Sequence, residues 1–397
     1  MRLSVAANYD PGIAGELAES SVEEVFGKLA SDFVGGGRPS YICTPVGKVS
    51  LAEYVRELAA HKIKFNYLLN SACMGNKEWS AKWQKNLMGM LEWLSEIGVT
   101  RLTVSTPYLL ELIKARRPEF YVRVGIFAQV DTPTRAMFWE NLGADAITLE
   151  SFSINRDFQA LRSIRKSVKC DLQLIANHIC LWNCPMQCYH QNGISHSSDN
   201  SGGVFFDYCL FNCALERISD GTQMVRSRWI RPEDISEYEA IGFTNFKILE
   251  RGMPSSVMVQ RVRAYSGRKF EGNLAEIFFS YGFKKATKQQ RLWYLKYFFK
   301  PWLFKIRHIT EFFKMARQQG MGFAIDRMPI VIDSSKIPAD FLERFKGQNC
   351  NDRDCADCGH CSKIAKEAVT IDNDFKREAI ERMSKIDSLL VEGKLWI

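Results

Sequence analysis

The alternation of short apolar runs with amphipathic stretches is the feature that most constrains how this chain can fold. Eight short runs before residue 252 read as strands, and helical patterns separate most of them. Short apolar runs are typical of parallel strands that are buried on both faces. Strands alternating with helices form βαβ units, and eight of them predict an α/β fold of the (β/α)8 TIM-like barrel type. The predicted strands are Leu3–Asn8, Ser40–Cys43, Lys64–Leu69, Arg101–Ser105, Tyr121–Val130, Ala146–Glu150, Asp171–Asn177 and Phe246–Glu250.

An open, doubly wound sheet is the alternative arrangement of the same elements. That fold usually carries a glycine-rich phosphate-binding turn directly after its first strand. No such turn follows Leu3–Asn8. The barrel is therefore the favoured interpretation.

One connection is much longer than the others and contains five of the twelve cysteines. It runs over residues 178–245, between the seventh and eighth predicted strands. A loop of this length in a compact domain usually has a function, and in a barrel it lies at the C-terminal face, where active sites are found. It ends in a predicted helix, with Pro232 near the first turn and Gly242 after the last.

The chain divides into three predicted regions. Residues 1–275 form the barrel with its cysteine-rich loop, residues 276–345 a basic and aromatic helical extension, and residues 346–397 a small cysteine-rich C-terminal segment. The segment from Lys284 to Arg317 contains ten basic residues and one acidic residue, so its net charge is +9, while that of the whole chain is +8. Packing on the barrel explains its aromatic residues; single-stranded nucleic acid, a membrane surface or a partner protein are alternative ligands.

The N-terminus lacks the pattern of a signal peptide, and no apolar stretch is long enough to cross a membrane. We therefore expect a cytoplasmic protein without a transmembrane segment. Twelve cysteines in a reducing compartment are not expected to form a disulfide framework. Metal binding, redox chemistry and buried packing remain as their uses.

The C-terminal cysteines give the sharper metal-binding pattern. Cys350, Cys355, Cys358 and Cys361 are spaced C-x4-C-x2-C-x2-C. Thiolates two residues apart can surround one cubane cluster, as in ferredoxin-like sequences. Structural zinc, the main alternative, more often uses two separated pairs of ligands. The polar residues around these cysteines argue against burial in a core.

The cysteines of the long loop are less regular. Cys180, Cys184 and Cys188 follow the seventh strand at three-residue gaps, and Cys209 and Cys213 come about twenty residues later. Five thiols exceed the four that one cluster needs. We favour Cys180, Cys184, Cys188 and Cys213 as ligands, with Cys209 as the first substitute. Zinc, a histidine ligand and a structural role remain open. With the tail, the prediction is two [4Fe–4S] clusters.

Polar residues at predicted strand ends surround the expected mouth of the barrel. Glu150 and His178 are the candidates for proton transfer, and Arg251 is the candidate for holding an anionic group. The alternative for such residues is that they cap helices or close turns, as Asp131 before Thr132-Pro133 does by its position. The strand-end set is Asn8, Tyr9, Ser105, Thr106, Gln129, Asp131, Glu150, Asn177, His178, Glu250 and Arg251.

Several of these motifs resemble the collagenase-like "peptidase U" family, family thirty-two of unknown catalytic type. The resembling residues are Gly35–Pro39, Glu150, Asn177–Cys180, Cys184-Pro185, His190, His196, Ile230–Asp234, Phe246–Ile248, Arg251, Tyr265, Gly272-Asn273 and the C-terminal cysteines. The resemblance implies a barrel with a cluster held by cysteines after its seventh strand. It also implies either a protease or an iron–sulfur protein for oxygen-independent hydroxylation of RNA bases or ubiquinone precursors. The chain departs from the family at Cys188, where an arginine is usual, and at Cys209, which is additional.

The predicted function is an iron–sulfur-dependent, oxygen-independent modifying enzyme with hydroxylase-type redox chemistry. Its substrate is an RNA base, an aromatic metabolite or another small molecule, and an electron-donor protein or a partner subunit is an expected partner. No nucleophile elbow and no HExxH motif supports proteolysis. A peptidase of the same family and a non-catalytic iron–sulfur subunit are the alternatives.

Overall fold

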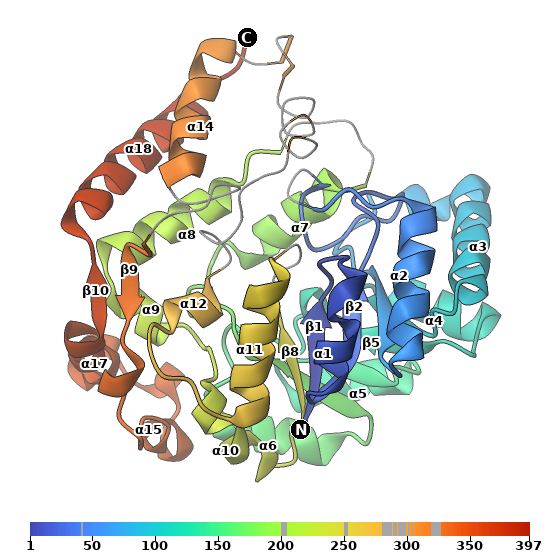
Figure 1. Cartoon of the computed structure of the whole chain (residues 1–397), viewed down its shortest axis with the longest axis horizontal. Helices are drawn as coiled ribbons and strands as arrows, with labels where there is room; N and C mark the ends of the chain where they lie inside the picture. Colours follow the sequence, from blue (N-terminus) through green and yellow to red (C-terminus); the bar gives the residue numbers. More distant parts are fainter. Residues whose placement is uncertain are drawn as a thin grey trace.

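The computed structural model contains a closed barrel of eight parallel strands in sequence order (Figure 1). It describes residues 1–40, 43–199, 205–249, 253–279, 288, 292, 299–300, 302–303, 305–318 and 327–397. Strand β1 pairs with β2 on one side and with β8 on the other, which closes the sheet. The predicted (β/α)8 barrel is therefore confirmed. The strands are β1 (Arg2–Ala6), β2 (Val22–Gly27), β3 (Lys64–Leu69), β4 (Arg101–Val104), β5 (Tyr121–Val124), β6 (Ala146–Thr148), β7 (Asp171–Ile175) and β8 (Asn245–Ile248).

The predicted second strand was wrong. Strand β2 lies at Val22–Gly27, not at Ser40–Cys43. Its sequence, VEEVFG, has two adjacent acids and so does not read as a buried apolar run. The structure explains the acid at position 24, because Glu24 points into the barrel and is only 1% exposed. The fifth strand is also shorter than predicted and ends at Val124.

The interior of the barrel has a polar layer near the N-terminal ends of the strands and an apolar layer nearer their C-terminal ends. Glu24 is paired there with Arg123 and accepts a hydrogen bond from the Ser4 hydroxyl at 3.1 Å. Gln173 continues the network by donating to Ser4 Oγ at 2.9 Å and to Asn245 Oδ1 at 2.8 Å. Ala6 and Phe26 lie two residues beyond Ser4 and Glu24 on their strands, and together with Leu68 of β3 they form a separate buried apolar cluster. Residues i and i+2 of a strand share a face, so both layers line the barrel lumen.

Helices surround the barrel and bury one apolar face each. Helix α3, for example, buries Trp83, Leu87, Leu91 and Leu94, and the Ser80 side chain caps its first turn. The surrounding helices are α1 (Ala14–Ala18), α2 (Lys48–Ala60), α3 (Ala81–Glu96), α4 (Pro107–Arg116), α5 (Pro133–Asn141), α6 (Phe158–Ser167) and α11 (Ser255–Gly267).

The described residues of the long connection between β7 and β8 form four α-helices. Helix α7 contacts loops at the C-terminal end of the barrel, since Ser195 Oγ accepts from Ala72 N at 2.8 Å and Ser198 Oγ accepts from Gly36 N at 3.0 Å (Figure 1). The predicted helix after Pro232 is confirmed, and Gly242 follows it with a positive φ of 91°. The helices are α7 (Gln187–Ser197), α8 (Tyr208–Ser219), α9 (Thr222–Arg226) and α10 (Ile235–Glu239).

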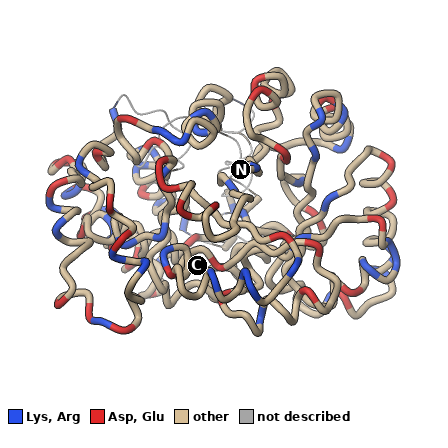
Figure 2. Tube along the Cα trace, turned by 90° about the horizontal axis from the view of Figure 1, so that it is seen from below, with Lys and Arg blue, Asp and Glu red and all other residues tan. Residues whose placement is uncertain are grey.

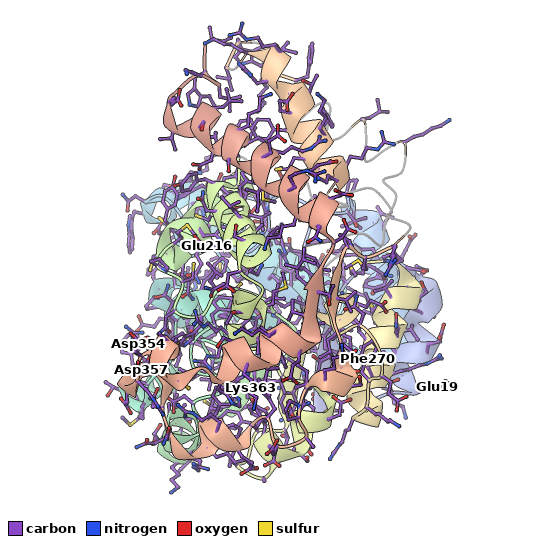
Figure 3. All side chains as sticks on the ribbon, turned by 90° about the vertical axis from the view of Figure 1, so that its left-hand side faces the viewer. Glu19, Glu216, Phe270, Asp354, Asp357 and Lys363 are labelled. Carbon is purple, nitrogen blue, oxygen red and sulfur yellow. The ribbon has the colours of Figure 1, made fainter. Side chains whose placement is uncertain are left out.

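The C-terminal part of the chain packs against this connection. Helix α18 lies along α8, and α17 lies along α9 (Figures 1 and 3). The elements are α12 (Ala275–Phe278), α14 (Ile309–Gln318), β9 (Ile330–Ile332), α15 (Glu343–Gly347), α16 (Cys355–Cys358), α17 (His360–Ala368), β10 (Val369–Ile371) and α18 (Asn373–Val391). None of the helices in the described part of the chain is long and apolar enough to span a membrane.

Acidic and basic residues are interspersed along the described chain (Figure 2). Of the segment from Lys284 to Arg317, the structure describes residues 305–317, which include most of α14, but only isolated positions before them. Its ligand therefore stays a prediction.

Candidate iron–sulfur sites

Four of the five cysteines in the long connection lie near one another. Cys180 and Cys184 follow β7, while Cys209 and Cys213 are one turn apart on α8 and so share a face. Burial, and then the neighbouring thiols of Cys213 and Cys184, raise the pKa of Cys180 to about 12. Burial, Asp207 and the same two thiols raise the pKa of Cys209 to about 12. We call Cys180, Cys184, Cys209 and Cys213 the loop cysteines.

Arginine side chains lie beside the loop cysteines. Arg217 is 4% exposed, and its Nη1 donates to Ile179 O at 3.0 Å and to Cys213 Sγ at 3.4 Å. Its charge lowers the pKa of Cys180 and of Cys184 against the effect of burial, and Arg38 acts on Cys180 in the same direction. Thiolates, not thiols, bind metals, so these cations favour the ligand form.

The glycine run before Arg38 lets this segment pass close to α7. Gly35 has a φ of +82°, and a Cβ atom there would lie 2.4 Å from Ser195 O. Only glycine fits such an approach with a left-handed backbone. The run thus brings Arg38 from the β2 side of the barrel to the loop cysteines.

Cys188 is placed differently from the loop cysteines. It is exposed on α7, and its Sγ accepts a hydrogen bond from Gln129 Nε2 at 3.3 Å. Gln129 follows β5 and has a left-handed φ of 51°. The positions of the side chains favour Cys209 over Cys188 as the fourth member of the loop set, whereas the sequence favoured Cys188.

The four C-terminal cysteines line one pocket. We call Cys350, Cys355, Cys358 and Cys361 the tail cysteines; Arg226 and Arg344 line the same pocket. Arg344 Nη2 donates to Cys358 Sγ at 3.4 Å. Burial raises the pKa of Cys358, but the backbone of His360 and the Arg344 side chain outweigh it, and the pKa is lowered.

The exposed acids between the tail cysteines point away from the pocket. Asp354 and Asp357 lie at the edge of the molecule, whereas Lys363 lies on α17 nearer its centre (Figure 3). Asp354 caps α16 by accepting from Ala356 N at 2.7 Å. The polar flanks of this motif are therefore solvated, and the sulfur atoms face the protein.

The donor sets differ in how they suit a single metal ion and an iron–sulfur cluster. No three His, Cys, Asp or Glu side chains among the described residues converge on the position of a single ion. An iron–sulfur cluster is larger than one ion and places its four thiolates around a cubane body. Four cysteines around one pocket, with Arg226 and Arg344 beside them, are the type of donor set that such a cluster uses.

The two cysteine sets are in contact through the residues between them. Asn183, which lies between Cys180 and Cys184, donates from Nδ2 to Asn351 Oδ1 at 3.0 Å. Asn351 directly follows Cys350. The sequence separates these segments by 168 residues, and nothing in either motif predicts their contact.

Glu150 and His178 are both buried at 4% exposure or less. Glu150 accepts from Ser153 N at 2.9 Å, from the Ser153 hydroxyl and from Gln187 Nε2 at 2.9 Å, which closes the turn after β6. His178 Nε2 donates to Ser151 O at 2.8 Å, and burial lowers the pKa of its ring to about 3. A ring with so low a pKa is a weak base near pH 7, and its Nε2 is used by Ser151 O, so the site favours a hydrogen-bonding role over that of a general base.

The remaining strand-end residues have mixed roles. Arg251 and Glu250 lie outside the described residues, so the anion-holding role of Arg251 stays a prediction. Asn177 Nδ2 donates to Ile277 O at 3.1 Å and so ties the barrel to α12. Thr132, not Asp131, caps α5, since Thr132 Oγ1 accepts from Arg135 N at 3.4 Å.

The sequence did not indicate the arginines that surround the cysteines. Arg217 and Arg344 lie within helices, where basic residues usually face solvent. No local motif distinguishes them from the other arginines of the chain.

The chain has relatives among known proteins. No model of a known protein family matches it. It is 33% identical over 246 residues to the uncharacterized protease MJ1657 of Methanocaldococcus jannaschii. The aligned region covers 62% of this chain and 72% of that protein.

Solved structures show weaker similarity. The U32 peptidase Mk0906 has 21% identity, a TM-score of 0.48 and coverage of 64% of this chain and 94% of that one. The YdjI aldolase from Escherichia coli K12 has 12% identity, a TM-score of 0.36 and coverage of 70% and 91%. Because a third of the residues are identical over nearly three quarters of the Methanocaldococcus protein, this chain belongs to the same family as that protein.

Proposed function

We propose that the protein is an enzyme that binds two [4Fe–4S] clusters, one on the loop cysteines and one on the tail cysteines. The observation that carries the proposal is that each motif gathers four thiols from separate turns or helices beside arginine side chains. An unligated set of buried thiols has no need of such cations. The ligand set of the loop cluster includes Cys209 in place of Cys188.

The proposed reaction is an oxygen-independent modification, such as hydroxylation, of an RNA base or an aromatic metabolite. When bound, a cluster supplies single-electron transfer or Lewis acidity. The chain's own residues then have three tasks. Arg217 and Arg344 stabilise thiolate charge, the glycine run at Gly35 positions Arg38, and the contact of Asn183 with Asn351 holds the two cysteine segments together.

Iron analysis tests this proposal directly. Protein purified without oxygen is expected to contain about eight iron and about eight acid-labile sulfide per chain. The full-length double variant Cys355→Ala/Cys358→Ala is expected to retain about four of each, because only the tail set is broken. Elemental analysis and electron paramagnetic resonance provide the measurement.

A matched control is Cys170→Ala. Cys170 is a half-buried cysteine near Glu140, away from both sets, and its replacement should leave the iron content unchanged. Zinc in place of iron, or equal iron in the wild type and the double variant, would reject the proposal.

A cysteine peptidase is the second candidate, because the relative is named a protease and because a histidine–aspartate pair lies near a cysteine. His196 Nδ1 is 3.2 Å from Asp199 Oδ2, which orients the ring as in a catalytic triad. A Cβ atom on Gly75 would lie 3.3 Å from His196 Cε1, and Gly75 N donates to Cys73 Sγ at 3.3 Å. Cys73 is thus the candidate nucleophile.

This candidate predicts peptide hydrolysis that survives treatment with an iron chelator. Casein cleavage should be lost in Cys73→Ala and kept in Cys43→Ala, a buried cysteine that donates to Pro39 O. Cleavage that is absent from the wild type, or that is unchanged in Cys73→Ala, excludes this nucleophile.

A further inference from the structure

A pocket of about 330 Å³ lies between the barrel, the long connection and the C-terminal segment. Its walls come from the loop after β6, from Trp182 and Asn183 between the first two loop cysteines, and from the residues around Cys350. This volume is in the range of small-molecule sites. The pocket is distinct from the one that the four tail cysteines line, but Cys350 borders both.

Arg228 is the feature of this pocket that points to a ligand. It is 4% exposed, and its guanidinium lies 4.6 Å from the centre of the Trp182 ring. Its Nε is buried without a hydrogen-bond partner. A buried cation with an unused donor is unfavourable unless an anion or acceptor reaches it.

A second buried arginine adds positive charge beside it. Arg156 is 2% exposed and donates to two backbone carbonyl oxygens, Val225 O at 2.7 Å and Trp229 O at 3.0 Å. Burial, and then the charge of Arg228, lower the pKa of Arg156 to about 10, so the two guanidinium groups repel each other. Arg156 remains charged near neutral pH.

The acids of the pocket wall are already engaged elsewhere. Asp131 is paired with Arg135 at 2.9 Å. Asp157 caps α6 by accepting from Ala160 N at 2.9 Å and also accepts from Asn349 Nδ2 at 2.7 Å. The tail thiol Cys361 lies near both buried arginines. Arg228 thus lines the pocket with a buried Nε donor that has no partner.

We propose that this pocket binds a small molecule with a carboxylate or phosphate group, and that the oxyanion contacts Arg228. A guanidinium stacked on an aromatic ring keeps its N–H edge free for two parallel hydrogen bonds to an oxyanion. The amides of Asn183 and Asn351 at the rim offer further polar contacts. The ligand lies beside Cys350 and beside the loop that carries Cys180 and Cys184.

The test is anion binding, measured by isothermal titration calorimetry on full-length protein purified without oxygen. Benzoate probes a carboxylate, inorganic phosphate probes a phosphate group, and benzamide is the neutral counterpart of benzoate. One of the two anions is expected to bind saturably and benzamide is not. Arg228→Met should weaken that binding by about tenfold or more.

A second pair of variants keeps the test valid where Arg228→Met does not fold. Asn183 and Asn76 are both exposed and both adopt left-handed φ values, 48° and 62°, which aspartate also tolerates. Asn183→Asp adds a negative charge at the pocket rim and should weaken anion binding severalfold. Asn76→Asp makes the same change away from the pocket and should not alter it.

Iron content distinguishes a failure of this inference from a failure of the proposed function. None of the residues proposed to contact the anion is a proposed iron ligand; Cys350 only borders the pocket. Full iron content without saturable anion binding, or with equal binding in wild type, Arg228→Met and Asn183→Asp, overturns the pocket assignment alone. Anion binding that depends on Arg228 in a protein without iron supports the pocket and rejects the clusters.

Discussion

Replacing Arg123 by methionine is expected to lower the free energy of unfolding by about 3–5 kcal/mol, since it leaves Glu24 as a buried carboxylate without its main partner. Both side chains are 1% exposed inside the barrel, and Arg123 Nη1 is hydrogen-bonded to Glu24 Oε1. Arg101 Nη1, 3.2 Å from Glu24 Oε2, remains to offset part of the charge. The loss should therefore fall toward the lower end of this range.

The pH dependence follows from the same pair. Burial raises the pKa of Glu24, but Arg123 outweighs it, and the pKa is lowered to about 2. A lowered carboxylate pKa stabilises the folded state above the unfolded-state pKa of about 4.3, and this stabilisation is lost as the pH falls toward 2. The difference in unfolding free energy between the wild type and Glu24→Gln should thus shrink below about pH 4.

Urea unfolding followed by circular dichroism measures both effects. The double variant Arg123→Met/Glu24→Leu removes both charges and should be more stable than Arg123→Met alone. Arg263→Met breaks an exposed ion pair with Glu16 and should cost only about 0–1 kcal/mol. Equal losses for Arg123→Met and Arg263→Met would mean that the buried pair does not stabilise the barrel.

Most of the barrel could be predicted because its strands are buried on both faces by apolar residues. Seven strands follow this rule closely enough to be located, with errors only at their ends. The second strand could not, because Glu24 faces a partner that is 99 residues away in the sequence. An apolar pattern predicts which strands are buried among apolar residues. It does not predict a strand whose charged side chain is buried in the barrel lumen and paired with a residue of another strand.

The cysteine positions could be predicted from their spacing, whereas the choice among them could not. Spacing groups Cys188 with Cys180 and Cys184, but a helix begins at Gln187 and turns Cys188 toward Gln129. Cys209 was expected to be a substitute, although α8 carries it on the same face as Cys213. The arginines beside the cysteines reach them only through the tertiary fold, so no local pattern marks them.

Cys209→Ser is accordingly expected to remove about half of the iron, from about eight to about four per chain, while Cys188→Ser leaves it unchanged. Cys209 is 4% exposed, and burial, Asp207 and the thiols of Cys184 and Cys213 raise its pKa, which places it beside the other two cysteines. Cys188 is exposed, and an amide already contacts its sulfur. Serine keeps the size of cysteine, so a difference in iron between the two variants reports on ligation and not on packing. The reverse result, with iron lost only in Cys188→Ser, would restore the ligand set that the sequence favoured and would require α7 to turn toward the loop cysteines when the cluster binds.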